Sequence, residues 1–150
     1  MRYRVLCATL LVCVALIGCG GNSSPSAPSP ATATFNGQWT GTTSHGQPLS
    51  FTVASERVTT MTIGYNYNGC SGSKTATDLD LPIVDLRNIS NLPPPDPYSF
   101  GGLVGPYSES DNTQITAFFK SPAEGSGHGI VLFVRPGCGE TIALWTATKR

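Results

Sequence analysis

Residues 58–67, which read VTTMTIGYNY, decide the fold class of this chain. Large apolar side chains occupy every second position of the stretch: Met61, Ile63, Tyr65 and Tyr67. Small or polar residues fill the positions between them. Successive side chains of a β-strand point to opposite faces of the sheet, so this alternation is typical of a strand with one buried face. The stretch therefore predicts a β-strand and not an amphipathic helix.

The same period of two recurs through the rest of the chain after residue 35. Strand-like runs rich in threonine, aliphatic and aromatic residues cover residues 35–43, 49–54, 115–119, 129–134 and 141–148. Clusters of Gly, Pro, Asn and Ser separate these runs, as is usual for antiparallel sheets. Residues 79–89 add one or two short strands, which Pro82 restricts to a sheet edge or a bend. The pattern predicts an all-β domain of seven to nine antiparallel strands over residues 35–150.

The N-terminus carries the pattern of an export signal. A short basic head precedes a 13-residue apolar run, residues 5–17, which is shorter than the roughly 20 residues of a membrane-spanning helix. The run ends in LIGC at positions 16–19, a sequence that closely resembles the lipobox of bacterial lipoproteins. The resemblance implies that residues 1–18 are a signal peptide and that Cys19 is lipidated with palmitate or a similar acyl chain. An ordinary secretory signal is the alternative.

This resemblance implies a lipid-anchored protein of the bacterial cell envelope. Gly20 follows the cysteine in place of the aspartate of an inner-membrane retention signal, so the outer membrane is the expected location in an organism with two membranes. Loss of Arg2 and Arg4 reduces nine basic side chains to seven against nine acidic ones, a formal charge of −2. Residues 19–34 begin with the predicted lipidated cysteine, Cys19, are otherwise small or polar and include three prolines. This composition predicts a disordered tether.

Two of the five cysteines, Cys70 and Cys138, are expected to form a disulfide. Both stand in glycine-rich turn sequences, and an exported domain occupies an oxidising compartment in which paired cysteines become bridged. The bridge would close a loop of about 69 residues and stabilise the fold by about 4 kcal/mol if it acts through chain entropy. A metal site or a reactive thiol is the alternative, but no histidine adjoins either cysteine and no CxxC motif is present.

Charge and composition exclude one class of partner. Lys and Arg number nine, Asp and Glu also number nine, and only 12% of the residues are charged. A protein that binds nucleic acid through a basic surface needs a clear positive excess. No nucleic-acid partner is therefore expected.

Neither a catalytic nor a metal signature stands out in the sequence. His45 and His128, the two histidines, are flanked by Gly or Ser and are expected to be solvated, and no G-x-S-x-G nucleophile elbow is present. Asp78, Asp80 and Asp85 lack the spacing of a calcium loop and suit an exposed strand equally well. The expectation is a protein that is not an enzyme, with no catalytic residue, no metal and no cofactor.

A second resemblance concerns the first strand run. Residues 37–39 read GQW, which is similar to the G-x-W motif that opens lipocalin and avidin-like barrels. The resemblance implies an up-and-down β-barrel in which the first strand, with Trp39, pairs with the last strand, with Trp145. A β-sandwich is the alternative architecture. Gly41 stands where the avidin motif places a polar contact to biotin, so no ligand follows from the resemblance.

Aromatic residues of the strand runs are the candidate ligand-binding residues. Trp39, Tyr65 and Tyr67 would offer large contact areas to a small apolar ligand at low entropic cost. Packing in the core is the expectation that competes with this role.

Two classes of function remain. The first is a tethered, non-catalytic binding or structural module of the envelope, with an envelope protein or a small apolar ligand as partner. The second is an inhibitor or accessory protein of an envelope enzyme, similar to small β-barrel lipoproteins that block lysozyme, acting through a charged loop such as residues 108–111. A hydrolase is a third and weaker alternative. An aromatic-lined cavity above about 300 Å³ would favour ligand binding, and a filled core would favour protein contact or a structural role.

Overall fold

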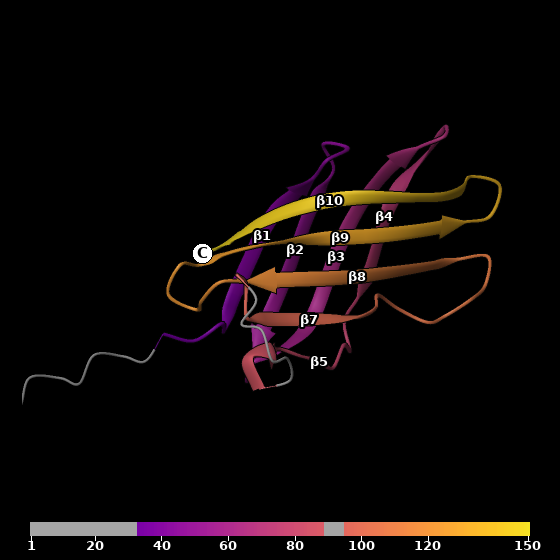
Figure 1. Ribbon diagram of the computed structural model, residues 1–150. Coiled ribbons are helices and arrows are strands. Elements are labelled where there is room, and N and C mark those ends of the chain that lie inside the picture. The colour runs from indigo at the N-terminus through magenta and orange to yellow at the C-terminus, as the bar shows by residue number, and fades with distance from the viewer. Residues whose placement is uncertain (1–32, 89–94) are drawn as a thin grey trace, which may run out of the picture. The chain divides into compact units, whose positions relative to one another are not determined.

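Ten antiparallel strands make up the computed structural model, which describes residues 33–88 and 95–150 (Figure 1). Cys19 and the predicted signal peptide lie outside the described residues. The elements are β1 (Gly37–Thr43), β2 (Pro48–Ala54), β3 (Arg57–Tyr67), β4 (Cys70–Ala76), β5 (Leu81–Pro82), β6 (Val84–Asp85), the 3₁₀ turn η1 (Leu86–Asn88), β7 (Tyr98–Leu103), β8 (Asn112–Phe119), β9 (Ser126–Arg135) and β10 (Gly139–Lys149). The predicted all-β antiparallel class is confirmed: eight strands have six or more residues, and β5 and β6 have two each.

The strands form one sheet in the order β4-β3-β2-β1-β10-β9-β8-β7-β6, with β5 paired to β3. β1 and β10 are antiparallel neighbours in the middle of this order, which confirms the expected pairing of the first and last strands. The sheet curls so that β1–β4 face β7–β10 across one core (Figure 1). Gly41 allows a very close approach of β1 to β10, because a Cβ atom there would lie 1.8 Å from the carbonyl oxygen of Thr146.

The sheet curls without closing fully into a barrel. Among the described strands, β4 pairs only with β3, and the chain crosses from the β3 edge to the β7 edge through the short strands β5 and β6. Pro82 lies in β5, at the sheet edge that the sequence predicted. The architecture is a curled half-barrel, intermediate between the predicted barrel and the predicted sandwich. Within the described residues, no helix has the length and hydrophobicity needed to cross a membrane.

The core is built from the inward-facing residues of both halves. Trp39 stacks on Phe51 with ring centroids 5.5 Å apart and an interplanar angle of 8°. Phe51 also contacts Phe100 of β7 at 5.6 Å and Trp145 of β10 at 6.1 Å. Phe51 therefore connects the two tryptophans and joins the two halves of the sheet.

Two tight hairpin turns set the register of β2, β3 and β4. Ser55 and Glu56 have φ of 51° and 58°, the conformation of a type I′ turn, which is unfavourable for residues other than Gly and Asn. The N-terminal segment supports this turn, because the Glu56 backbone N–H donates to Asn36 Oδ1 at 2.9 Å. The next turn uses Asn68 and Gly69, the pair that type I′ hairpins prefer.

Candidate functional site

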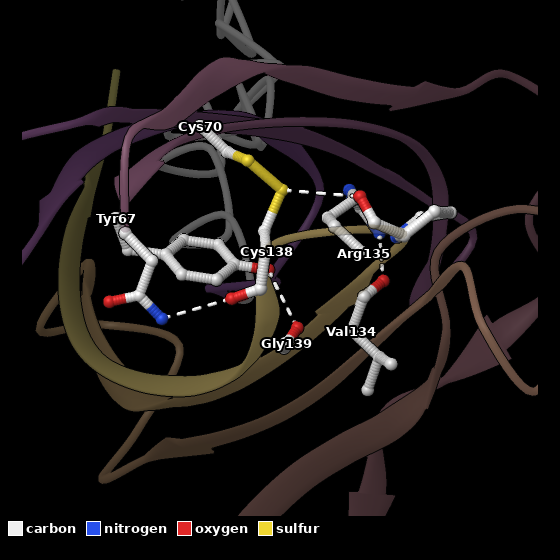
Figure 2. Close-up of a disulfide and its surroundings, with 8 residues drawn as sticks. Tyr67, Cys70, Val134, Arg135, Cys138 and Gly139 are labelled. Carbon is white, nitrogen blue, oxygen red and sulfur yellow. Dashed lines mark hydrogen bonds between the residues drawn. A yellow bond between two sulfur atoms is a disulfide. The ribbon is translucent and has the colours of Figure 1, made fainter.

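The Cys70–Cys138 disulfide joins the start of β4 to the turn between β9 and β10 (Figure 2). The two Cα atoms are 6.0 Å apart and the residues are 68 positions apart in the sequence. Hydrogen bonds reinforce the junction: Asn68 Nδ2 donates to the Cys138 carbonyl at 2.9 Å, and the Tyr67 hydroxyl donates to the Gly139 carbonyl at 3.4 Å. The predicted disulfide is confirmed, and it connects the two halves of the curled sheet.

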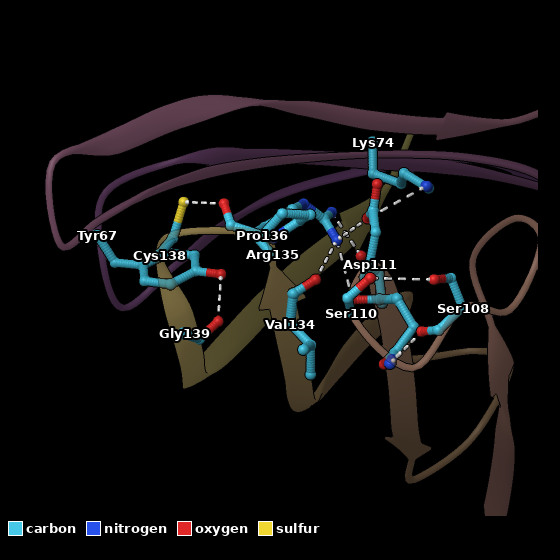
Figure 3. Close-up of polar contacts among 12 residues, drawn as sticks. Tyr67, Lys74, Ser108, Ser110, Asp111, Val134, Arg135, Pro136, Cys138 and Gly139 are labelled. Carbon is cyan, nitrogen blue, oxygen red and sulfur yellow. Dashed lines mark hydrogen bonds and ion pairs between the residues drawn. The ribbon is translucent and has the colours of Figure 1, made fainter.

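Arg135 forms a second connection close to the disulfide (Figure 3). Its side chain is 7% exposed and donates to Asp111 Oδ1 at 2.7 Å, to Thr113 Oγ1 at 2.7 Å and to the Asn112 carbonyl at 2.9 Å. The guanidinium carbon also lies 4.8 Å from the ring centroid of Tyr65 in β3. Arg135 thus links the ends of β8 and β9 to the opposite half of the sheet by hydrogen bonds and a cation–π contact.

Lys74 of β4 approaches the same carboxylate from the other side, with its Nζ 3.7 Å from Asp111 Oδ1. We call Tyr65, Lys74, Asp111, Asn112, Thr113 and Arg135 the Arg135 cluster. Asp111 lies near both cations, so one carboxylate offsets two positive charges and the cluster carries a formal net charge of +1. The arrangement is that of a structural network across the interior, and it leaves no free cation directed at a ligand within the cluster.

Two of the three aromatic candidates, Trp39 and Tyr67, occupy core positions, and Tyr65 is half-buried against the core. Trp39 is fully buried and its indole nitrogen donates to the Phe35 carbonyl at 3.0 Å. Tyr67 is 8% exposed, and Tyr65 lies 6.1 Å from it between ring centroids. Burial raises the pKa of Tyr67, and the nearby charge of Arg135 opposes this shift in part. The structure brings the two tyrosines together without Trp39, and ligand binding by these residues stays a prediction.

Both histidines are exposed, which agrees with the expectation that they are solvated. His45 lies in the turn between β1 and β2. His128 lies on the outward face of β9, with its Nε2 3.8 Å from Asp96 Oδ2. The absence of a catalytic role for either residue stays a prediction.

Most of the aspartates singled out in the sequence pair with arginines. Asp80 accepts a hydrogen bond from Arg57, which lowers the pKa of the Asp80 carboxyl, and Arg87 lowers the pKa of Asp85 in the same way. Within the part of the chain that the structure describes, Asp78 forms no ion pair and accepts a hydrogen bond from the Thr77 hydroxyl at 3.4 Å. Across residues 33–88 and 95–150, no group of three or more His, Cys, Asp or Glu side chains is placed to hold a metal ion.

The interior of the curled sheet is filled, and the hollows are on the surface. Nineteen buried apolar side chains make up the described core. One hollow of about 400 Å³ lies between the end of β4 and the loop after β7 and is lined by residues 75–79, Gly105 and Pro106. It exceeds the roughly 300 Å³ typical of a small-molecule site, but no aromatic side chain lines it. Two smaller hollows include core aromatic residues in their lining: Trp39 and Phe51 in one of about 160 Å³, and Trp145 in one of about 270 Å³.

An apolar patch covers part of the outward face of β9 and β10. Ile142 and Leu144 are 59% and 62% exposed, and Ile130 is 44% exposed. The register places Ile130 opposite Leu144 and Leu132 opposite Ile142, so the four side chains form one contiguous group. We call Ile130, Leu132, Ile142 and Leu144 the apolar patch. Threonines continue the same face of β10 beyond it.

The segment predicted as an inhibitory loop, residues 108–111, follows β7 and precedes β8. Asn112 Nδ2 donates to the Ser108 carbonyl at 2.9 Å, and Asp111 is held by Arg135. Glu109 is therefore the charged side chain that this segment presents to solvent without such a partner. Inhibition of an envelope enzyme stays a prediction.

Comparison of the chain with protein-family models, with curated proteins and with solved structures finds no match. The resemblances to lipoproteins and to lipocalin or avidin-like barrels rest on the quoted residues alone.

Sequence reasoning missed the two features that organise the open side of the sheet, Arg135 and the edge strand β4. Arg135 shares the parity of Val131 and Phe133 in β9, all of which are buried. A charged residue at an inward position of a predicted strand is a signal that could have found it.

Proposed function

We propose that this chain is a lipid-anchored protein of the bacterial cell envelope and that its β-domain is a non-catalytic binding or structural module. The observation that carries the proposal is LIGC at positions 16–19 behind a 13-residue apolar run, which supplies a lipidation site at Cys19. Gly20 favours the outer membrane in an organism with two membranes. Residues 20–34 hold the domain away from the lipid surface as a polar tether.

The surface of the domain supports contact with another envelope protein. The core is filled with its own side chains, so a small ligand has no interior site in the described residues. The apolar patch, by contrast, leaves Ile142 and Leu144 largely in solvent. Contiguous apolar groups on the surface of a soluble domain mark interaction sites.

Metabolic labelling of the full chain with a radioactive fatty acid tests the anchor. The wild-type protein should incorporate the label and enter the detergent phase of a two-phase detergent extraction, and Cys19→Ser should lose the label and leave an uncleaved or soluble precursor. Cys13→Ser is the matched control, because Cys13 lies in the part that a lipoprotein signal peptidase removes. An unlabelled wild-type protein in the aqueous phase would contradict the proposal.

Site-specific photo-crosslinking in cells tests the binding role. A photoreactive residue at position 144, in the apolar patch, should give an adduct of one defined mass. The same residue at position 148 is the control, because Thr148 lies on the same face of β10 outside the patch. Identical adduct patterns at the two positions would argue against a specific contact surface.

A further inference from the structure

β4 is an open edge of the curled sheet. It pairs with β3 along seven residues, from Cys70 opposite Tyr67 to Ala76 opposite Met61, and with no other described strand. Soluble proteins protect such edges with proline, charged side chains or very short strands. β4 has seven residues and no proline, and its one charged residue, Lys74, lies beside Asp111, so this edge carries a single protecting charge.

The hairpin register determines which backbone groups of β4 are free. A two-residue turn makes its flanking pair, Tyr67 and Cys70, a hydrogen-bonded pair, and such pairs alternate along an antiparallel ladder. The N–H and C=O groups of Ser71, Ser73 and Thr75 therefore point away from β3. These three residues are exposed, and they offer three donors and three acceptors in a straight row.

The 400 Å³ hollow lies at the end of this row. Its lining residues include the apolar Ala76, Leu79 and Pro106 and the acidic Asp78. Asp78 has no cationic partner among the described residues, whereas Asp80 has one and Asp111 has two. An apolar wall that ends in an unpaired carboxylate matches a Lys or Arg side chain, whose aliphatic stem packs on the wall while its charge meets the carboxylate.

We propose that β4 accepts an extended segment of a partner protein as an added β-strand, and that the hollow binds a Lys or Arg side chain of that segment. Strand addition uses the free backbone groups for affinity and a side-chain pocket for specificity. This inference rests on the proposed role as a binding module and names the class of its partner. The chain's own residues 20–34 fit poorly, because they contain no Lys or Arg and three prolines, which lack a backbone donor.

The test uses the full chain in detergent micelles and a library of fluorescent nine-residue peptides. The peptides alternate Val and Thr, and each position is replaced in turn by Lys, Arg, Glu or Ala. Fluorescence polarisation should show that Lys or Arg at one position binds about fivefold more tightly than Glu, the size expected for a half-exposed ion pair. N-methylation of the peptide backbone along one edge should abolish binding. Peptide binding should also slow amide hydrogen exchange at Ser71, Ser73 and Thr75.

Two variants separate the pocket from the edge. Asp78→Asn should remove the preference for Lys over Glu, and Glu140→Gln, at an exposed carboxylate of β10, should keep it. Ser73→Pro removes a donor that points away from β3, so it should block binding while the β3–β4 pairing remains. Asp78→Asn keeps the proposal testable if the proline variant does not fold.

The inference would be overturned if no library peptide binds, or if Lys and Glu peptides bind equally. It would also be overturned if the amides of Ser71, Ser73 and Thr75 become protected without peptide, through self-association at high protein concentration. Fatty-acid labelling of the same preparation separates this inference from the anchor. A labelled chain that binds no peptide would contradict the proposed strand addition and leave the lipid anchor in place. An unlabelled chain that binds peptide would contradict the lipid anchor and leave strand addition in place.

Discussion

Arg135 donates a hydrogen bond from Nη1 to Asp111 Oδ1 at 2.7 Å, with 7% of the arginine side chain and 44% of the aspartate side chain exposed. The pair is therefore asymmetric: the cation is removed from water and the anion is partly solvated. Removal of a charge from water is costly unless hydrogen bonds compensate it. Here Thr113, the Asn112 carbonyl and the Tyr65 ring supply that compensation, so Arg135 is fixed between the two halves of the sheet.

Arg135→Ala should destabilise the domain by about 2–4 kcal/mol, because it leaves Thr113 and the Asn112 carbonyl without their buried donor and opens a cavity beside Tyr65. Urea denaturation followed by tryptophan fluorescence measures the change. Arg87→Ala is the control, since Arg87 forms an exposed pair with Asp85 and should leave the midpoint almost unchanged. Equal effects of the two substitutions would show that burial of Arg135 does not matter.

Loss of the Cys70–Cys138 disulfide should lower the stability of the domain about as much as loss of the Arg135 side chain. The Cys70→Ala/Cys138→Ala variant releases a loop with 68 positions between its ends, which corresponds to about 4 kcal/mol of stability by chain entropy. The free energy of unfolding from urea titrations measures this loss, and thiol labelling of the unreduced wild-type domain should find neither cysteine free. A variant as stable as the wild type would imply that the Arg135 cluster alone holds the two halves together.

Local patterns were sufficient to predict most strands and the disulfide. Met61, Ile63 and Tyr67 alternate with polar residues, and this alternation shows which face of β3 is buried. The pattern can be read from the sequence because it lies within a single strand. The glycine-rich contexts of Cys70 and Cys138 indicated turns, and the structure places the cysteines at a hairpin and a turn that meet.

Features that depend on long-range pairing could not be predicted in this way. β4 is not one of them: residues 70–76 contain no alternating large apolar residues, but the Asn68-Gly69 pair that returns the chain along β3 is a local hairpin signal present in the sequence. The identity of the open edge follows from the order of all ten strands. The hollow beside Asp78 needs the loop after β7 to lie next to β4, a contact between residues about 30 positions apart that no local propensity encodes.

Acid should destabilise the domain below about pH 4. Hydrogen bonds from Arg57 and Arg87 lower the pKa of Asp80 and Asp85 in the folded state, and unfolding restores the ordinary pKa. A group with a depressed folded pKa contributes stability above its unfolded pKa and loses that contribution as the pH falls through the folded value. The urea midpoint should therefore fall less steeply with acid in Asp80→Asn/Asp85→Asn than in the wild type. Identical slopes in the variant and the wild type would refute the assignment of the acid sensitivity to these two carboxyls.

Gly129 is the position in β9 where a single methyl group should be most damaging. A Cβ atom there would lie 1.9 Å from the Thr116 carbonyl oxygen and 2.9 Å from Cζ2 of Trp145, and the first of these atoms belongs to the neighbouring strand, so it cannot move alone. Gly129→Ala should therefore separate β8 from β9 and lower the free energy of unfolding by at least about 2–3 kcal/mol, at the upper end of overpacking costs. His128→Ala is the matched control one residue away, because His128 lies on the outward face and should leave the urea midpoint unchanged. An unaltered midpoint in Gly129→Ala would mean that the sheet relaxes freely at this position, contrary to the close approach of β8, β9 and β10 around the Trp145 ring.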